Sequence, residues 1–274
     1  QGLLAINILQ ELDDGLRDQG TGSEFYESLV SLHKMLLSED MQVLLVGEEE
    51  QKHHLLASVQ NGWSDAKAET KASSQFVLPK TEDCTRQLWV TSTEVNFCAK
   101  AYPTVTLSHP DSAALAVLGG FMRNGYLHRA IREQGGAYGG GASNDTGVGA
   151  FRFYSYRDPR LDETLSDFDK AIDWVLEGKH EWRQVEEAIL GVIGSMDRPG
   201  SPAGEAKDAF YNLLHERTPA QRQAFRQRVR ETTLADLQKV TEKYLQTDKS
   251  SIAVITNKSG ADTMEDKNFE AFSV

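Results

Sequence analysis

The sequence predicts an α+β fold: a mixed, mostly antiparallel β-sheet with helices packed on one face. Three observations support this class. Strands alternate with helices early in the chain, a β-hairpin pattern lies in the middle, and helices are stacked toward the end. No break in composition demands a second domain, so we expect a single domain over residues 1–274: a leading helical segment (1–40), an α+β domain (41–260) and a tail (261–274).

The first elements come from hydrophobic periodicity. Residues 23–37 predict a helix that Ser23 can cap, because apolar side chains recur at helical spacing. Residues 41–47 are a short apolar run typical of a buried strand, and residues 49–59 predict a short helix. Residues 65–85 are polar and without a period, so we interpret most of them as a connection.

The centre of the chain combines strands, a helix and glycines. Residues 88–102 have strand composition, and a helix follows from Asp111 toward Gln134. A glycine cluster occupies residues 135–141 and leads into residues 148–156, where apolar and polar side chains alternate. That order is the signature of a hairpin.

The last third is mainly helical and ends in a strand. The apolar pattern predicts helices around 161–176, 185–192, 210–214, 221–230 and 234–245, with a break at 198–202 and a closing strand at 251–255.

Composition excludes some classes of function. Hydrophobic residues make up 39% and charged residues 26% of the chain, as in ordinary globular proteins, and no apolar run is long enough to cross a bilayer. The first residues lack the basic region of a secretory signal, and no initiator Met precedes Gln1, which suggests a fragment or a processed chain. The two cysteines, Cys84 and Cys98, are too few for a disulfide framework and favour a reducing compartment.

Charge narrows the choice of partner. The formal net charge of -12 argues against nucleic acid, because phosphate binding needs clustered Lys and Arg. An acidic chain favours cationic partners such as basic peptides, although acidity also simply promotes solubility. We therefore expect no nucleic-acid partner and no membrane partner.

The sequence shows no metal site and no nucleophile motif. No histidine belongs to a His-x-x-His, His-Glu-x-x-His or His-x-x-Glu-His pattern, and there is no Gly-x-Ser-x-Gly turn. We expect no metal ligand in this chain; the histidines are His33, His53, His54, His109, His128, His180 and His215.

The glycine cluster has three interpretations. A phosphate-binding loop fits poorly, because no Gly-Lys-Ser/Thr follows and the cluster precedes a strand. The glycines can instead end a helix and start a tight strand. Alternatively, a strand edge without bulky side chains lets an extended peptide pair with it by β-augmentation.

Arg132 and Tyr138 flank the cluster. Arg132 can bind a peptide carbonyl or carboxylate, and Tyr138 can donate its hydroxyl to a carbonyl or a developing oxyanion. The residues alone favour plainer roles: a salt bridge from Arg132 to Glu133 or Asp111, and a half-buried ring for Tyr138.

A family resemblance changes that balance. Residues 127–142, which read Leu-His-Arg-Ala-Ile-Arg-Glu-Gln-Gly-Gly-Ala-Tyr-Gly-Gly-Gly-Ala, resemble the C-terminal half of the presequence-protease branch (subfamily C) of the pitrilysin/insulysin M16 zinc peptidases. Residues 153–159 (Phe-Tyr-Ser-Tyr-Arg-Asp-Pro) continue the resemblance, with shorter matches as far as Trp174. It covers about residues 41–255 and is most specific between Pro103 and Trp174.

The resemblance implies a fold and a division of labour. Members are clamshells of two halves, each made of two similar M16 or LuxS-like α+β domains, with zinc held in the first domain by His-x-x-Glu-His and a distant Glu. The last domain lacks zinc but presents an Arg and a Tyr to the peptide, here Arg132 and Tyr138. The implied substrate-binding set is Arg132, Gly135, Gly136, Tyr138, Gly139 and Gly140, with Tyr138 also acting on the oxyanion.

The implied function is metal-assisted hydrolysis of short unstructured peptides in a closed chamber. This chain would be the zinc-free C-terminal part, inactive alone, and its partner would be the N-terminal catalytic half that binds the zinc. A non-catalytic M16-fold scaffold or assembly subunit is the alternative, and a stand-alone peptide- or nucleotide-binding module is a more distant one. We expect a bacterial cytoplasmic location, or an organelle matrix for a eukaryotic protein.

Overall fold

A computed structural model describes most of the chain, and no helix among the described residues is both long enough and apolar enough to cross a bilayer. The described residues are 2–17, 19–38, 42–63 and 83–273. They divide into two compact units, which we call the helical unit (1–80 and 200–216) and the sheet unit (81–199 and 217–274). A single domain over the whole chain stays a prediction.

The helical unit contains the leading segment of the chain. Its elements are α1 (Leu3–Leu16), α2 (Gln19–Ser38), the 3-10 turn η1 (Glu49–Gln51), α3 (Lys52–Gly62) and α7 (Pro202–Leu214). The predicted helices at 23–37 and 49–59 are confirmed within α2 and across η1 and α3. The structure describes the side chains of this unit's helices except those of residues 4 and 19–21, and none of the side chains that it describes there is buried.

The predicted buried strand at 41–47 is wrong. Residues 42–48 form no strand, and Val43 and Val46 are 50% and 46% exposed. No strand among the described residues pairs with this segment, and a strand needs a paired neighbour and a covering layer to be stable. The predicted connection at 65–85 lies mostly outside the described residues.

The sheet unit is built on six strands in the order β3-β4-β2-β5-β1-β6. These strands are β1 (Arg86–Val90), β2 (Asn96–Pro103), β3 (Gly139–Asp145), β4 (Ala150–Asp158), β5 (Ser251–Thr256) and β6 (Glu270–Ser273). The neighbours β3-β4, β4-β2 and β2-β5 are antiparallel, whereas β5-β1 and β1-β6 are parallel. The predicted mixed, mostly antiparallel sheet is therefore confirmed.

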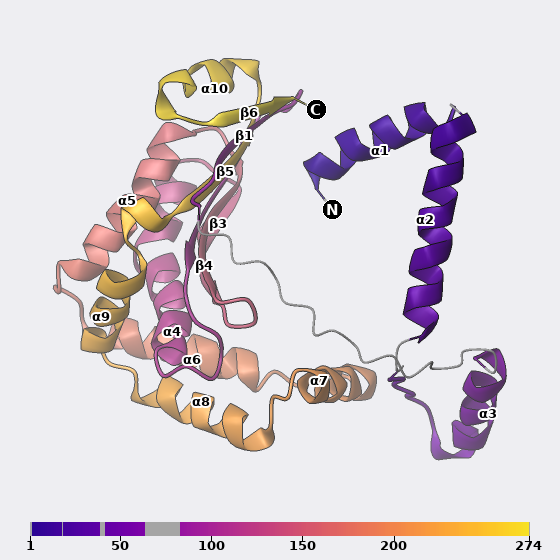
Figure 1. The fold of residues 1–274 in the computed structure, drawn as a ribbon. Helices are drawn as coiled ribbons and strands as arrows, with labels where there is room; N and C mark the ends of the chain where they lie inside the picture. The colour runs from indigo at the N-terminus through magenta and orange to yellow at the C-terminus, as the bar shows by residue number, and fades with distance from the viewer. Residues whose placement is uncertain (1, 18, 39–41, 64–82, 274) are drawn as a thin grey trace. The chain divides into compact units, whose positions relative to one another are not determined.

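The helices of this unit pack on one face of the sheet (Figure 1). They are α4 (Ser112–Met122), the π-helix η2 (Arg123–Gln134), α5 (Asp162–Leu176), α6 (Trp182–Met196), α8 (Pro219–Glu231), α9 (Leu234–Tyr244) and α10 (Lys258–Asp262), with 3-10 turns η3 (Thr247–Lys249) and η4 (Glu265–Lys267). Strand β4 shows the two faces: Phe151, Phe153 and Ser155 are buried, while Arg152, Tyr154 and Tyr156 are exposed.

The predicted helices of the last third are confirmed, whereas the helix α10 and the strand β6 were not predicted. Residues 210–214 are only the end of α7, which begins at Pro202. The predicted tail contains α10 in part and β6 in full. Strand β6 has four residues and a single large apolar side chain, Phe272, so it carries no readable period.

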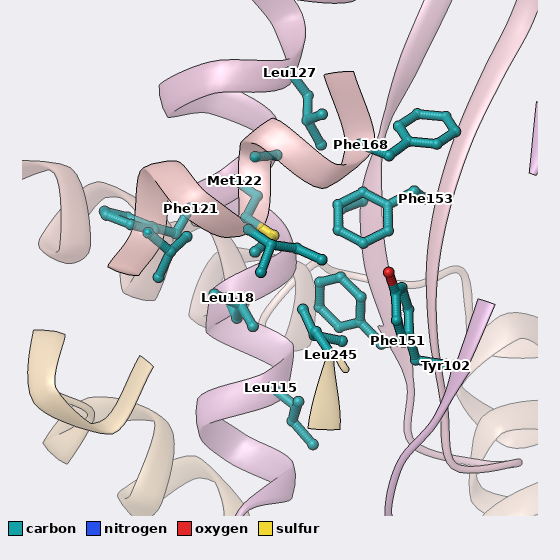
Figure 2. Close-up of a cluster of buried hydrophobic side chains, with 14 of the residues drawn as sticks. Tyr102, Leu115, Leu118, Phe121, Met122, Leu127, Phe151, Phe153, Phe168 and Leu245 are labelled. Atoms are coloured by element: carbon teal, nitrogen blue, oxygen red, sulfur yellow. The ribbon is translucent and has the colours of Figure 1, made fainter. Parts of the chain in front are cut away.

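The core lies between α4 and the central strands. Phe151 and Phe153 of β4 and Tyr102 of β2 meet Leu118 and Met122 of α4, and all five are at most 1% exposed (Figure 2). Burying one such side chain contributes about 1.5–3 kcal/mol. The core thus fixes α4 against the strands that carry the candidate site.

Helix α4 also lies very close to the edge strand. A Cβ at Gly119 would be 2.9 Å from the Cα of Ser143 and 3.2 Å from the carbonyl oxygen of Ala142. Only glycine permits this approach. The contact positions β3 directly over the helix that leads into η2.

Candidate functional site

The predicted site residues lie together at one helix-to-strand junction. Arg132 is in the last turn of η2, Gly135 and Gly136 follow it, and Tyr138 directly precedes Gly139 and Gly140, the first residues of β3. Because β3 is the edge strand of the sheet, the whole set lies at one border of the sheet unit.

The turn itself depends on a glycine. Gly136 has φ +79, a left-handed conformation that glycine adopts without steric cost. The N–H of Gly136 donates to the carbonyl of Arg132, and the N–H of Ala137 donates to the carbonyl of Ile131, both at 3.1 Å. These bonds end the helix as a glycine C-cap does and direct the chain into β3.

Two further glycines are required by close packing. A Cβ on Gly135 would overlap the guanidinium of Arg160 and lie 2.5 Å from the carbonyl oxygen of Ile131. A Cβ on Gly140 would be 2.8 Å from Cγ2 of Ile131 and 3.0 Å from the carbonyl oxygen of Tyr154. Gly139 differs, because a Cβ there would meet nothing within 4 Å. Packing therefore explains Gly135 and Gly140 but not Gly139.

Arg132 does not form either of the salt bridges that the sequence suggested, to Glu133 or to Asp111. The carboxylate of Glu133 lies 3.4 Å from Nδ1 of His128, and that of Asp111 lies 2.7 Å from Nζ of Lys243. Arg132 is exposed, and no described side chain forms an ion pair with it. Its guanidinium can therefore bind a ligand without breaking an internal contact.

Tyr138 is more exposed than a half-buried ring. It is 71% exposed, and its ring packs edge-to-face against that of Tyr156 with centroids 5.8 Å apart. Its backbone N–H donates to the carbonyl of Arg157 at 3.3 Å, while no described group bonds its hydroxyl. The ring is thus held from one side, and the hydroxyl has no hydrogen-bond partner among the described residues.

The outer edge of β3 can pair with an extended chain. Among the described strands, β3 pairs only with β4. Successive residues of an antiparallel strand bond in alternate directions, and Tyr138 bonds toward β4. The N–H and C=O groups of Gly139, Gly141 and Ser143 consequently face outward, as β-augmentation requires.

Sequence reasoning missed the residue that links the two sides of the junction. Nη2 of Arg160 donates to the carbonyl of Ala130 in η2 and to Oδ2 of Asp167 in α5, both at 3.1 Å. The only sequence signal was its place directly after the Arg157-Asp158-Pro159 match. The π-helical form of η2 was also missed, because periodicity does not separate a π-turn from an α-helix end.

The described residues do not fit a zinc site. No three His, Cys, Asp or Glu side chains among them gather closely enough to hold a metal ion. The thiol of Cys98 is buried, and burial raises its pKa to about 12.

Comparison with solved structures identifies the fold. The M16 peptidase inactive domain from Pseudomonas fluorescens aligns with a TM-score of 0.58 and 16% identity over 75% of this chain and 51% of that chain. Pitrilysin aligns with a TM-score of 0.57 and 14% identity over 82% of this chain and 25% of that chain. At these identities the likeness concerns the fold, and the fold is that of an M16 peptidase domain.

Sequence comparison then identifies the family. The model of the PreP C-terminal domain matches residues 86–258, so the chain belongs to the PreP C-terminal domain family. The mitochondrial presequence protease of Kluyveromyces lactis is 39% identical over 164 residues, 59% of this chain, and that of Mus musculus is 40% identical over 158 residues, 57% of this chain. The matched part spans only 16% and 15% of the length of those two relatives.

Proposed function

We propose that this chain is the C-terminal, substrate-binding part of a zinc metalloendopeptidase that degrades short unstructured peptides. The observation that carries the proposal is the junction itself. An unpaired Arg132 and an exposed Tyr138 stand at the start of an edge strand whose outward backbone groups are free among the described residues. This arrangement suits an extended peptide, which needs backbone partners and a few polar contacts.

Each residue has a distinct task in this proposal. Tyr138 donates its hydroxyl to the oxygen that becomes negative as the peptide carbonyl is attacked, and Arg132 holds a neighbouring carbonyl or carboxylate. Losing one donor to an oxyanion typically costs about 10²–10³-fold in rate. Zinc, bound in a part of the protein outside this chain, supplies the activated water.

The proposed partner is an N-terminal half that carries the zinc, and this chain alone does not hydrolyse peptides. The names of the relatives support this division, because they are presequence proteases and the matched part is a small share of each. The net charge of -12 favours basic peptides as substrates. The relatives are mitochondrial, which supports an organelle matrix for a eukaryotic protein; the bacterial cytoplasm stays a prediction from the sequence.

The test is chelator-sensitive cleavage of an unstructured basic peptide by the full-length polypeptide. Tyr138→Phe removes only the hydroxyl, and we expect kcat to fall about 10²-fold or more with little change in melting temperature. Arg132→Ala is expected to raise KM. Tyr211→Phe is the matched control, because Tyr211 is an exposed tyrosine on α7 and does not belong to the junction.

Two outcomes would contradict the proposal. Full activity of Tyr138→Phe and Arg132→Ala would make both residues structural. A wild-type protein that cleaves no peptide would favour the alternative, an M16-fold scaffold or assembly subunit.

A further inference from the structure

Arg157 has an unusual backbone conformation. Its φ of 51 is left-handed, although it lies inside the paired strand β4. The two other described non-glycine residues with such φ values, Glu216 and Asn268, lie just beyond helical segments, where the left-handed conformation is common. In a strand the same conformation is sterically unfavourable for a residue with a Cβ.

A β-bulge accounts for this conformation. On β2 a single residue, Phe97, lies opposite two residues of β4, Tyr156 and Arg157. As a result Tyr156 and Arg157 are both exposed, which breaks the alternation of the strand. Bulges redirect a side chain in this way and are frequent beside active sites.

Buried groups hold the bulge in place. Asp158, the next residue, is fully buried, and its carboxylate accepts the N–H of Arg160 at 3.0 Å and the hydroxyl of Thr164 at 2.7 Å. Its carbonyl accepts Nδ2 of Asn96 at 3.1 Å. The conformation of Arg157 is therefore fixed by the protein before any ligand binds, as strained residues at functional sites are.

The bulge positions Arg157 beside the candidate site. Its carbonyl accepts the N–H of Tyr138, so the two residues are directly opposite each other across β3 and β4. Neither Arg157 nor Arg132 forms an ion pair with any described side chain, although the chain as a whole is strongly acidic. Tyr138 thus has two arginines near it that form no ion pair with a described side chain, one in the preceding helical turn and one across the strand pair.

We propose that Arg157 is a second substrate-binding cation, which binds a carboxylate of the peptide beside Tyr138. The inference rests on the proposed function. A guanidinium and a carboxylate form two parallel charge-assisted hydrogen bonds, which neutral carbonyls cannot match. The carboxylate is either the C-terminus of the peptide or an Asp or Glu side chain.

The experiment compares three matched peptides on the full-length polypeptide: a parent with one Glu and a free C-terminus, its C-terminal amide, and its Glu→Gln version. Arg157→Gly removes the guanidinium and adopts φ 51 without strain. We expect kcat/KM to fall about tenfold or more for peptides with the bound carboxylate and less than about twofold for the one lacking it. Arg152→Gln is the control, because that guanidinium already pairs with Asp145 at 3.2 Å.

Equal losses on all three peptides, no loss, or the same selectivity change in Arg152→Gln would overturn the inference. If Arg157→Gly does not fold, Arg157→Asn replaces it, since Asn also tolerates this φ. If the wild-type protein cleaves none of the peptides, the proposed function fails, and a binding measurement then tests the role of Arg157. Fluorescently labelled peptides are then titrated into the metal-stripped protein, and equal affinities of wild type and Arg157→Gly would refute a role for Arg157.

Discussion

At the scale of single residues, the junction separates two reasons for a glycine. Gly135 and Gly140 are needed because neighbouring atoms occupy the space of a side chain, and Gly136 is needed for its positive φ. Gly139 has neither reason. The pattern Gly-Gly-Ala-Tyr-Gly-Gly looked uniform in the sequence, yet its members do different things, and only atomic neighbours distinguish them.

This difference predicts that alanine at Gly140 lowers stability whereas alanine at Gly139 does not. Gly140→Ala would force its Cβ against Ile131 and the Tyr154 carbonyl, so we expect a loss of about 1–3 kcal/mol in the free energy of unfolding. Gly139→Ala meets open space, so its stability should equal that of the wild type. Thermal unfolding followed by circular dichroism measures both.

The same pair tests the approach of the peptide. In the full-length polypeptide, Gly139→Ala should weaken peptide cleavage despite normal stability, because the added methyl would stand on the face of β3 and crowd the side chains of an extended peptide paired beside it. Normal stability of Gly140→Ala, or unchanged cleavage by Gly139→Ala, would contradict this account.

At the scale of elements, α4 and η2 form the support of the site. The run from Asp111 to Gln134 was predicted as one helix, and the structure keeps it continuous while its second half becomes π-helical. Asp111 at its head accepts hydrogen bonds from Lys243 and Tyr244 of α9, both at 2.7 Å. The support is thus fixed at its start by a charged contact and near its end by Arg160.

The contact at Asp111 predicts a dependence of stability on pH. Burial alone would raise the pKa of Asp111, but the hydrogen bonds from Lys243 and Tyr244 outweigh it and hold the pKa below its ordinary value. A folded pKa below the unfolded one means that the stabilisation is complete above the unfolded pKa and is lost as the pH falls through the folded pKa.

Asp111→Asn should therefore lower the free energy of unfolding by about 1–2 kcal/mol at pH 7, and the gap to the wild type should narrow as the pH falls below about 4. Urea unfolding at several pH values measures this gap. Glu187→Gln, which disrupts an exposed helix pair with Arg183, is the control and should change little. A gap independent of pH would show that the charge of Asp111 is unimportant.

At the scale of the whole molecule, local features could be predicted and distant pairings could not. The β3-β4 hairpin was visible because its strands are adjacent in the sequence. The pairing of β1 with β5 joins Arg86 to Ile252, and no pattern in either segment indicates its partner. For the same reason, the apolar run at 41–47 predicts a strand although no described strand pairs with it. The family resemblance indicated Arg132 and Tyr138 as site residues. That Arg132 has no ion-pair partner among the described residues could be seen only in the structure.

The distribution of buried side chains predicts the result of truncation. Every buried side chain among the described residues belongs to the sheet unit. Removing residues 1–80 should thus leave a cooperative thermal transition within a few degrees of that of the full 274-residue chain. Removing residues 264–274 should lower it clearly, because Met264 is 1% exposed and the Phe272 ring stacks on Trp89 at 4.5 Å.

Circular dichroism of the two truncated chains gives the comparison. A large drop in melting temperature from the first deletion, or no drop from the second, would mean that the stabilising core is not confined to the sheet unit.

The position of β1 also matters while the protein is being made. This strand leaves the ribosome long before its two neighbours, β5 (Ser251–Thr256) and β6 (Glu270–Ser273), which come much later in the chain. Until those residues emerge, Leu88 and Trp89 lack the partners that bury them, and both edges of the strand are open to other chains. Premature termination before residue 251 would consequently leave a nascent product prone to aggregate, and chaperones that shield apolar strands would be needed throughout synthesis of the domain.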